Sequence, residues 1–278
     1  MLYLRNWETL DFLEVHYINF KSSYGNIYYE IHGQDNSTVV AFLHGILMNH
    51  KMFEKQIDAF KDEYKLLLWD MPEHGQSVKL HRDFDFSVVA DCFIELLDEL
   101  KIQEVILVGV SLGGWVSQFI AQRYPDRVKA LALEGSTPLH VDLRKVAFIF
   151  KVYCFMFRLL PWNLVKRIIV KMTEKMDLDP DLKEAFKEIF FRLEKRTVLH
   201  LFRGVSQEIR KGIEEDIPHP ILMTHGEKEL GFFKKMGRTW EEKNPQLEYR
   251  EIPGAGHGAN TFNPEEYNRD LKRFLSSQ

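Results

Sequence analysis

VILVGVSLGGW (residues 105–115) is the stretch that decides the fold. Its first half is an apolar, β-branched run typical of a buried strand, and its second half begins a helical pattern. A serine lies between the two halves, with glycines two positions before and two positions after it. Such a tight turn strains the serine backbone and brings neighbouring backbone so close that only glycine fits on either side. We therefore predict a strand, a sharp turn that exposes Ser111, and a helix.

Short apolar runs of the same kind recur along the chain. The candidate strands are 27–32, 38–44, 65–70, 104–110, 129–134, 220–225 and 246–252. The candidate helices are 50–62, 86–100, 112–124 and 264–276, with Asp85 or Ser87 and the pair Asn263-Pro264 as N-terminal caps. The middle strands are apolar on both faces, as in parallel strands covered by helices. The alternation predicts an α/β fold with a doubly wound, mostly parallel sheet flanked by helices.

Residues 138–216 interrupt this alternation because they carry no strand signal. One helical face would contain Phe148, Val152, Phe155, Met156 and Leu159. Pro161 would end that helix. We predict an inserted helical cap or lid at 138–216, with an α/β core made of 1–137 and 217–278. Such insertions usually lie over the carboxyl ends of the strands, where open α/β sheets bind ligands.

The bulk composition limits the classes of function. The chain has 278 residues, 45% of them hydrophobic, which is enough for one large core. Its formal charge of −4 argues against binding of nucleic acid, which needs clustered basic charge. Cys92 and Cys154 have no CxxC pairing, so we expect two reduced, buried thiols. Charged residues interrupt 1–20, and no apolar run has the length of a membrane span, so we expect a cytoplasmic protein.

A nucleophilic serine needs a base, and the chain has eleven histidines. His257 differs from the others because it lies in IPGAGHGAN (252–260), after the last candidate strand. The carboxyl ends of parallel strands meet at one edge, so this loop can reach Ser111. We predict that His257 is the base.

Hydrolysis also needs N–H groups that stabilise a developing oxyanion. The turn itself supplies the N–H of Leu112. The second donor is expected from FLHGILMNH (42–50), where the N–H of Ile46 follows the strand. We expect His44 to be a structural, hydrogen-bonded residue.

Four short motifs together resemble those of a known family. They are LHG (43–45), DMPEHGQS (70–77), GVSLGG (109–114) and GAGHG (254–258). In order and spacing they resemble the oxyanion strand, the D-x-x-x-H-G-x-S loop, the nucleophile elbow and the histidine loop of the α/β-hydrolase fold superfamily. The resemblance extends from about residue 20 to the end and is to a capped serine hydrolase of the esterase or lipase type. It implies that 138–216 is a lid and that His74-Gly75 is a structural turn.

The resemblance also implies a position for the acid that orients the histidine. HGEKE (225–229) is similar to the family pattern H-G-x-x-D and puts Glu229 where aspartate is usual. Glutamate has one more methylene, so the loop must lie further back; triads with glutamate occur in this fold. Glu227, another acid or no acid are the alternatives. A proline that usually follows is replaced by LGFF (230–233), and Val110 stands where a histidine is common.

The sequence lacks the residues that aspartyl-ester, metal-dependent or phosphate-binding chemistry would need. Since the nucleophile is serine, chemistry through an aspartyl ester, as in epoxide hydrolases, is disfavoured. Metal-ligand spacing is absent, and no G-K-[ST] follows the glycines of GVSLGG, so we expect no metal and no cofactor.

Residues 144–171 contain seven basic side chains and no acidic one, interleaved with aromatic residues. Three interpretations stay open. The aromatic side chains pack on the core while the basic ones extend outward; they line an apolar acyl or aromatic-substrate pocket; or the segment docks on an anionic membrane surface.

These features predict a serine hydrolase that cleaves a carboxylic ester of a small, apolar substrate. Ser111 would be the nucleophile, His257 the base and Glu229 the orienting acid. The same groups could hydrolyse a thioester, a lactone or the carbon–carbon bond of a β-ketone, because the pocket selects the leaving group. The alternative is a catalytically silent fold that binds a ligand or a partner. The sequence does not give the oligomeric state.

Overall fold

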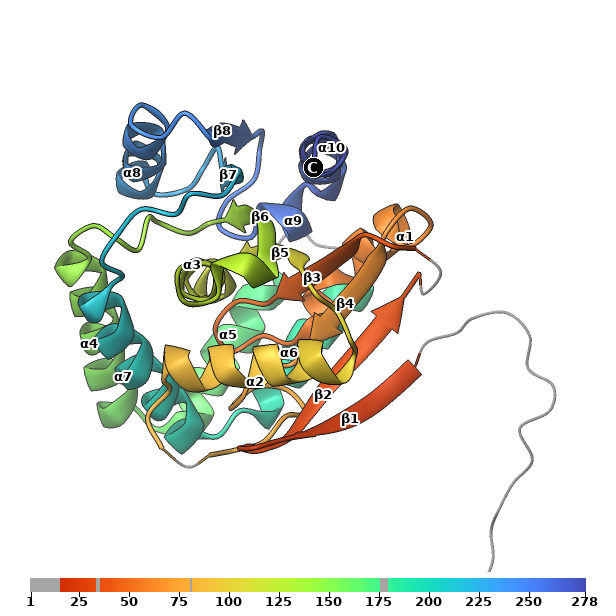
Figure 1. Ribbon diagram of the computed structural model, residues 1–278. Coiled ribbons are helices and arrows are strands. Elements are labelled where there is room, and N and C mark those ends of the chain that lie inside the picture. Colours follow the sequence, from red (N-terminus) through yellow and green to blue (C-terminus); the bar gives the residue numbers. More distant parts are fainter. Residues whose placement is uncertain (1–15, 34–35, 81, 176–179) are drawn as a thin grey trace, which may run out of the picture.

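The computed structural model describes residues 16–33, 36–80, 82–175 and 180–278, so that residues 1–15 of the predicted core lie outside it. An eight-stranded sheet with the order β1-β2-β4-β3-β5-β6-β7-β8 forms its centre (Figure 1). The strands are β1 (His16–Ser22), β2 (Gly25–His32), β3 (Val39–Leu43), β4 (Lys65–Trp69), β5 (Val105–Val110), β6 (Val128–Glu134), β7 (Ile221–Gly226) and β8 (Leu247–Ile252). The strands from β4 to β8 in this order pair in parallel, which confirms the predicted sheet.

The two strands at one edge are antiparallel. β2 pairs antiparallel with both β1 and β4. β1 is absent from our predicted strands, because its sequence HYINFKS mixes polar and apolar residues and gives no apolar run. It forms a hairpin with β2 through a turn that closes at the pair Ser22 and Gly25, where glycine has a positive φ of 135°.

Helices cover both faces of the sheet. They are α1 (Glu54–Phe60), α2 (Phe86–Glu99), α3 (Leu112–Arg123), α4 (Arg144–Leu159), α5 (Trp162–Glu174), α6 (Pro180–Arg192), α7 (Lys195–Lys211), α8 (Gly231–Glu241), α9 (Ala259–Phe262) and α10 (Pro264–Leu275), with short 3-10 turns at His50–Phe53 and Pro125–Arg127. Asp85, rather than Ser87, caps α2 by accepting from the N–H of Ser87. Asn263 caps α10 with Pro264 at its first position, as expected. α8 and the short α9 are helices that we did not predict.

Alternating strand residues enter two separate cores, as the period of a strand requires. In β3, Ala41 and Leu43 pack with α2 and α3, whereas Val40 and Phe42 pack with α1 and α10. This arrangement is the doubly wound fold expected from strands that are apolar on both faces.

Four helices, α4 to α7, lie between β6 and β7, where we predicted a helical insertion. α4 and α7 run side by side at one end of the sheet (Figure 1). The entry and exit of the insertion meet, because the N–H of Ile213 donates to the carbonyl of Leu139 at 3.3 Å. Gly204 of α7 packs so closely on the core that a Cβ there would lie 2.4 Å from the Phe84 backbone nitrogen. The division into two domains stays a prediction.

Candidate active site

The turn between β5 and α3 has the strained backbone that the sequence predicts. Ser111 has φ 54° and ψ −110°, an unfavourable region for a residue with a side chain. A Cβ at Gly109 would lie 2.5 Å from the carbonyl oxygen of Gly113, and one at Gly113 would lie 1.9 Å from that of Leu43. Neither glycine can be replaced without moving backbone. The two glycines around the serine are therefore required by contact.

The end of β6 holds this turn from the side. The N–H of Ser111 donates to the carbonyl of Glu134 at 2.8 Å. The hydroxyl of Ser136 donates to the carbonyl of Ser111 at 2.6 Å. A Cβ at Gly114 would lie 2.0 Å from that same Ser136 hydroxyl. The serine backbone is thus fixed by two bonds to the neighbouring strand end, while its hydroxyl is left free of these contacts.

His257 and Glu229 come together as a hydrogen-bonded pair. The His257 Nδ1–H donates to Glu229 Oε2 at 2.6 Å. The Glu229 side chain is 5% exposed and that of His257 is 49% exposed. Because Nδ1 faces the carboxylate and carries the proton, Nε2 is left unprotonated in the neutral ring. The ring is thus oriented to accept a proton from a group in the open part of the site.

The electrostatics of the pair favour a carboxylate beside a basic imidazole. Burial by itself raises the pKa of Glu229, but the hydrogen bond and positive charge of His257 outweigh it and keep that pKa below its usual range. Desolvation by itself lowers the pKa of His257, but the hydrogen bond to Glu229 and the charge of Glu134 outweigh it and raise that pKa above its usual value.

Two loops are joined to bring this pair together. The N–H of Lys228, after β7, donates to the carbonyl of Ala255, after β8, at 2.8 Å. A Cβ at Gly226 would lie 2.2 Å from the Gly256 carbonyl oxygen, which explains the glycine before the acid. Glu227 points elsewhere: its Oε2 accepts from the N–H of Gly254 at 2.8 Å. Of the two glutamates, Glu229 alone pairs with the histidine.

The histidine ring lies over the strand end next to the serine. A Cβ at Gly135 would lie 3.0 Å from His257 Cε1. Gly135 follows Glu134, which pairs with Val110 across the sheet, and Val110 precedes Ser111. Neighbouring strands are about 4.8 Å apart, so Ser111 and the ring lie on adjacent strand ends at one edge. Among the described residues there is no hydrogen bond between the Ser111 hydroxyl and the ring.

The two N–H groups predicted to bind an oxyanion belong to Leu112, which follows Ser111 in the chain, and to Ile46, which follows a glycine close to Ser111. Leu112 begins α3, and Ile46 follows Gly45, where a Cβ would lie 3.8 Å from the Ser111 Cβ. In the part of the chain that the structure describes, neither N–H donates to another backbone carbonyl. The end of a helix and a free N–H together favour negative charge at this point. Their role in binding an oxyanion stays a prediction.

His44 supports this loop as a structural residue. Its Nδ1–H donates to the carbonyl of Gly45 at 2.9 Å, and its Nε2 accepts from the N–H of Met71 at 3.0 Å. Burial lowers the pKa of His44 to about 4, so the ring is neutral. The ring ties the strand end that carries Ile46 to the loop after β4.

The DMPEHGQS stretch forms a structural turn around Asp70. The buried Asp70 carboxylate accepts from the N–H groups of His50 and Gln76 at 2.9 and 2.8 Å. A Cβ at Gly75 would lie 2.0 Å from Asp70 Oδ2, and Gly75 also has a positive φ of 46°. His74 donates from Nδ1 to the carbonyl of Pro72 at 3.0 Å. The pair His74-Gly75 thus shapes a turn, as the resemblance implies.

Glu134 is a residue of the site that the sequence did not reveal. It is fully buried at the end of β6, and its Oε1 accepts from the N–H groups of Ala259 and Gly258 at 2.8 and 3.2 Å. Its Oε2 has no hydrogen-bond partner within the described residues. Burial raises the pKa of Glu134 to about 6. The carboxylate therefore anchors the backbone just after His257, and its negative charge acts on the His257 ring.

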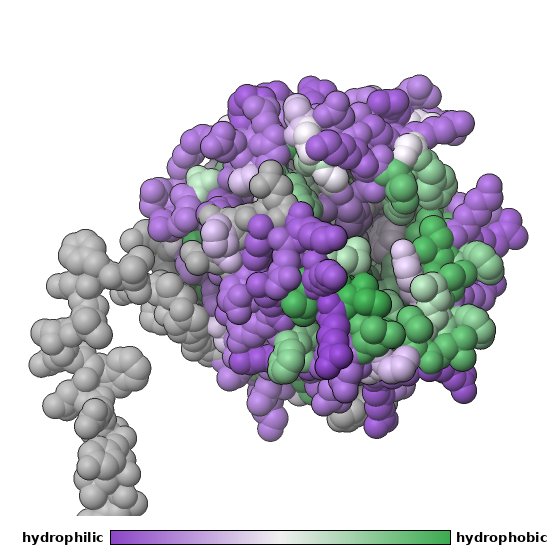
Figure 2. Space-filling view, turned by 180° about the vertical axis from the view of Figure 1, so that it is seen from behind, coloured by the Kyte–Doolittle hydropathy of each residue, from purple (hydrophilic) through white to green (hydrophobic). Residues whose placement is uncertain are grey.

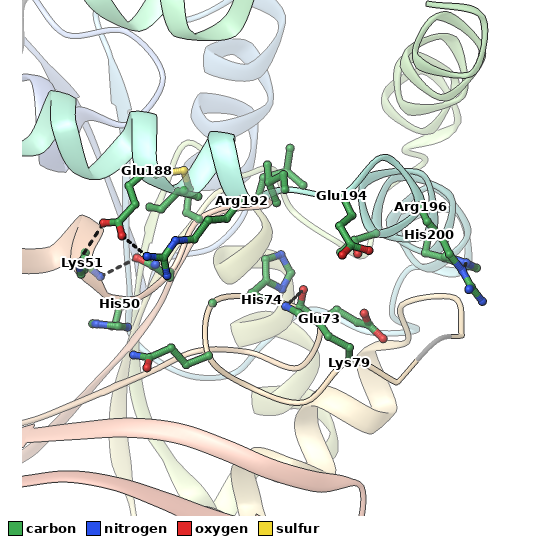
Figure 3. A pocket seen from close by; sticks show the side chains of 18 residues that line it. His50, Lys51, Glu73, His74, Lys79, Glu188, Arg192, Glu194, Arg196 and His200 are labelled. Atoms are coloured by element: carbon green, nitrogen blue, oxygen red, sulfur yellow. Dashed lines mark hydrogen bonds and ion pairs between the residues drawn. The ribbon is translucent and has the colours of Figure 1, made fainter. Parts of the chain in front are cut away.

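A cavity of about 500 Å³ opens between the cap and the core loops (Figure 3). Cap helices α6 and α7 contribute Glu188, Arg192, Arg196 and His200, and core loops contribute residues 47–51 and 73–79 in part. Lys51 of the core pairs with Glu188 of α6 across it, and Arg192 pairs with the same Glu188 along the helix. Its lining includes Leu47 and Met48, just after Ile46, but not Ser111 or His257. The cavity is more polar than the apolar pocket that we expected, and that pocket stays a prediction.

Metal ligands do not gather in the described ranges. No three His, Cys, Asp or Glu side chains in these ranges are grouped so that they could hold a metal ion. The site is built from side chains and backbone N–H groups.

Comparisons with known proteins agree with this fold. The model of the α/β-hydrolase fold family matches residues 38–264. The chain is 26% identical to a pimeloyl-[acyl-carrier protein] methyl ester esterase of Chromobacterium violaceum, over 91% of this chain and 99% of that protein. An esterase of Exiguobacterium antarcticum superposes with a TM-score of 0.78 at 18% identity, over 94% and 100% of the two chains. An enol-lactonase of Burkholderia xenovorans does so with a TM-score of 0.77 at 18% identity, over 93% and 100%.

Proposed function

We propose that this chain, which belongs to the α/β-hydrolase fold family, is a serine hydrolase that cleaves carboxylic esters. It is a hydrolase by its family and relatives. The observation that supports the finer proposal is the 2.6 Å hydrogen bond between His257 Nδ1 and Glu229 at the sheet edge that also carries the Ser111 turn. A histidine oriented by a buried carboxylate beside a strained serine is the arrangement that activates a hydroxyl as nucleophile.

In the proposed reaction, the Ser111 oxygen attacks the ester carbonyl while His257 Nε2 takes the hydroxyl proton. Glu229 keeps the ring in the tautomer with the proton on Nδ1 and stabilises its charged form. The N–H groups of Leu112 and Ile46 donate to the oxyanion. The carbon–oxygen bond to the alcohol then breaks, and His257 gives the proton to the departing alcohol. Water then attacks the acyl group while His257 Nε2 takes its proton. The bond between the acyl carbon and the Ser111 oxygen breaks, and His257 returns the proton to that oxygen, which releases the acid and free Ser111.

The substrate class that we propose is a small ester with an apolar acyl or aromatic part, in a cytoplasmic protein without cofactor or metal. The triad does not choose the leaving group, so thioesters, lactones and β-ketones remain within reach of the same chemistry. Oxygen esters, open or cyclic, are supported by one relative named a methyl ester esterase and one structural neighbour named an enol-lactonase. A catalytically silent fold that only binds a ligand is the alternative from another class.

Labelling with a fluorophosphonate probe tests the proposal. We expect the folded chain to form an adduct at Ser111, located by mass spectrometry of the digested protein, and Ser111→Ala to form none. Hydrolysis of p-nitrophenyl esters of increasing acyl length would then define the pocket, with a lactone and a thioester as comparisons. A folded wild-type chain that takes no label and cleaves none of these substrates would be a binding protein instead.

A further inference from the structure

α4 and α5 expose a large apolar surface whose residues do not line the cavity described above. Most of the large apolar side chains exposed in the described residues lie on α4 and α5: Phe148, Ile149, Val152, Tyr153, Phe155, Met156, Leu159, Leu164, Ile168 and Met172. Phe148, Phe155 and Leu159 are 65%, 64% and 66% exposed. Single exposed apolar residues are ordinary, but a contiguous set marks a contact surface. Figure 2, seen from behind, shows apolar surface gathered on the side of the molecule where α4 lies.

On α4 this surface is a stripe along one side of the helix. Phe148, Val152, Phe155 and Leu159 follow each other at spacings of four, three and four residues, which places them on one face. Val146 and Ala147 are buried, and the carbonyl of Ala147 accepts from the Ser206 hydroxyl of α7. One side of α4 therefore packs on the cap while the other side presents apolar side chains outward.

On α5 apolar and basic side chains form two neighbouring rows. Leu164, Ile168 and Met172 are exposed and four residues apart. Arg167, Lys171 and Lys175 are also exposed, each three residues beyond one of them. Since residues three apart are neighbours on a helix, the two rows lie next to each other. α5 therefore presents apolar side chains flanked directly by cations.

The charge of this surface is mainly positive: Glu174, at the end of α5, is the acidic residue of the two helices, and it pairs with Lys187 of α6. Residues 144–171 contain seven basic residues and no acidic one, in a chain with a formal charge of −4. Lys151, Arg158, Arg167 and Lys171 have no acidic partner within the described ranges. A second copy of the same surface would be repelled by these charges, whereas an anionic layer with an apolar interior would satisfy both the charges and the apolar side chains.

We propose that the α4–α5 surface docks on an anionic lipid bilayer, with its apolar side chains in the headgroup boundary and its basic side chains at the phosphates. No helix of the described residues is long and apolar enough to cross a membrane, so the docking is peripheral. This proposal does not depend on the proposed catalysis, because vesicle binding is measured without turnover.

Sedimentation of the full chain with vesicles tests the proposal. We expect binding to an equal mixture of phosphatidylcholine and phosphatidylglycerol, and much weaker binding to phosphatidylcholine alone. Raising the salt from about 0.1 to 1 M shortens the Debye length from about 10 to 3 Å and should release the protein. Equal binding to both vesicles, or none to the mixture, would overturn the proposal.

Two exposed double variants of equal charge change separate a specific surface from net charge. Each basic residue near an anionic surface is worth about 1 kcal/mol, which is about fivefold in affinity. Lys151→Glu/Arg158→Glu removes two cations and adds two anions, so it should weaken binding by at least about 30-fold. Lys235→Glu/Lys243→Glu, on or just after α8 and outside the cap, should leave it nearly unchanged. Equal losses in both variants would overturn the proposed surface.

An apolar variant completes the test. Phe148→Ser/Phe155→Ser/Leu159→Ser should remove vesicle binding and keep the circular dichroism spectrum and fluorophosphonate labelling of the wild type, since all three side chains are exposed. Size-exclusion chromatography of both proteins completes the comparison. If the wild type is a dimer that this variant converts to a monomer, the surface joins two copies and the proposal is wrong.

Discussion

The serine turn and the histidine loop reach the same edge of the sheet by different means. Around Ser111 the shape is set by backbone contacts of Gly109 and Gly113, within a few residues and one neighbouring strand. Around His257 the shape is set by two carboxylates, Glu134 at the end of β6 and Glu229 in the loop after β7. Close backbone packing of the glycines dominates the first region, and side-chain carboxylates that form long-range hydrogen bonds dominate the second. Substitutions in the first region should therefore lower the stability of the fold, whereas substitutions in the second should lower the rate of the reaction.

The largest expected effect is in the serine turn. Gly113→Ala would put a Cβ 1.9 Å from the Leu43 carbonyl oxygen, so backbone must move. We expect the free energy of unfolding to fall by roughly 3–5 kcal/mol, measured by urea denaturation, with loss of Ser111 labelling. Gly256→Ala in the histidine loop is the control, because nothing lies within 4 Å of a Cβ there, and it should change stability by at most about 0.5 kcal/mol. Similar losses in both would remove the contrast between the regions.

The next effect is on the acid that orients the histidine. Glu229→Gln keeps the size of the side chain but no longer fixes the proton on His257 Nδ1. We expect kcat for a p-nitrophenyl ester to fall by roughly 10²–10⁴-fold with little change in the melting temperature. A loss of less than threefold would mean that another acid serves the histidine.

Glu134 should act on the pH dependence of the reaction. The base must be neutral, and the charge of Glu134 raises the pKa of His257, so activity falls as the pH drops through that raised pKa. Glu134→Gln removes this charge, which lowers the pKa of His257 and moves the acid limb of kcat/KM to lower pH. A pH profile of the variant and the wild type measures the shift. If the acid limb of kcat/KM does not move and only the stability falls, Glu134 serves solely to anchor the loop.

The smallest effect is expected at the other glutamate of the loop. The Glu227 side chain accepts from the exposed N–H of Gly254, so Glu227→Gln keeps an acceptor at that place. We expect kcat and KM within about twofold of the wild type. A loss comparable to that of Glu229→Gln would show that the two glutamates exchange roles.

The same contrast explains what the sequence could predict. The serine turn depends on residues that are close in the sequence, so residues 105–115 were enough to predict its strand, glycines and helix. His257 was predicted from the glycines that surround it. Glu134 was not, because its partners Gly258 and Ala259 lie more than a hundred residues away and its strand reads as an ordinary buried one. The choice of Glu229 over Glu227 needed the family resemblance, because only the conformation of the folded loop decides which of the two acids faces the histidine.

β1 and α8 escaped prediction for local reasons. β1 is an edge strand with polar residues, so it lacks the apolar run by which the central strands were found. α8 begins at Gly231 and contains Gly237, and glycine lowers helix propensity. Gly237 is nevertheless required, because a Cβ there would lie 2.5 Å from the Tyr249 ring. Tertiary packing thus overrides local preference in α8.

The bond between Ile213 and Leu139 has a consequence for how such a protein changes over evolutionary time. A segment whose two ends already meet can be lengthened, shortened or exchanged without stretching the sheet that carries it. The serine turn and the histidine loop lie on strand ends that this exchange does not touch. If the predicted cap is such a segment, descendants of this chain can acquire new specificities by exchanging it, while the strand ends of the predicted site stay the same.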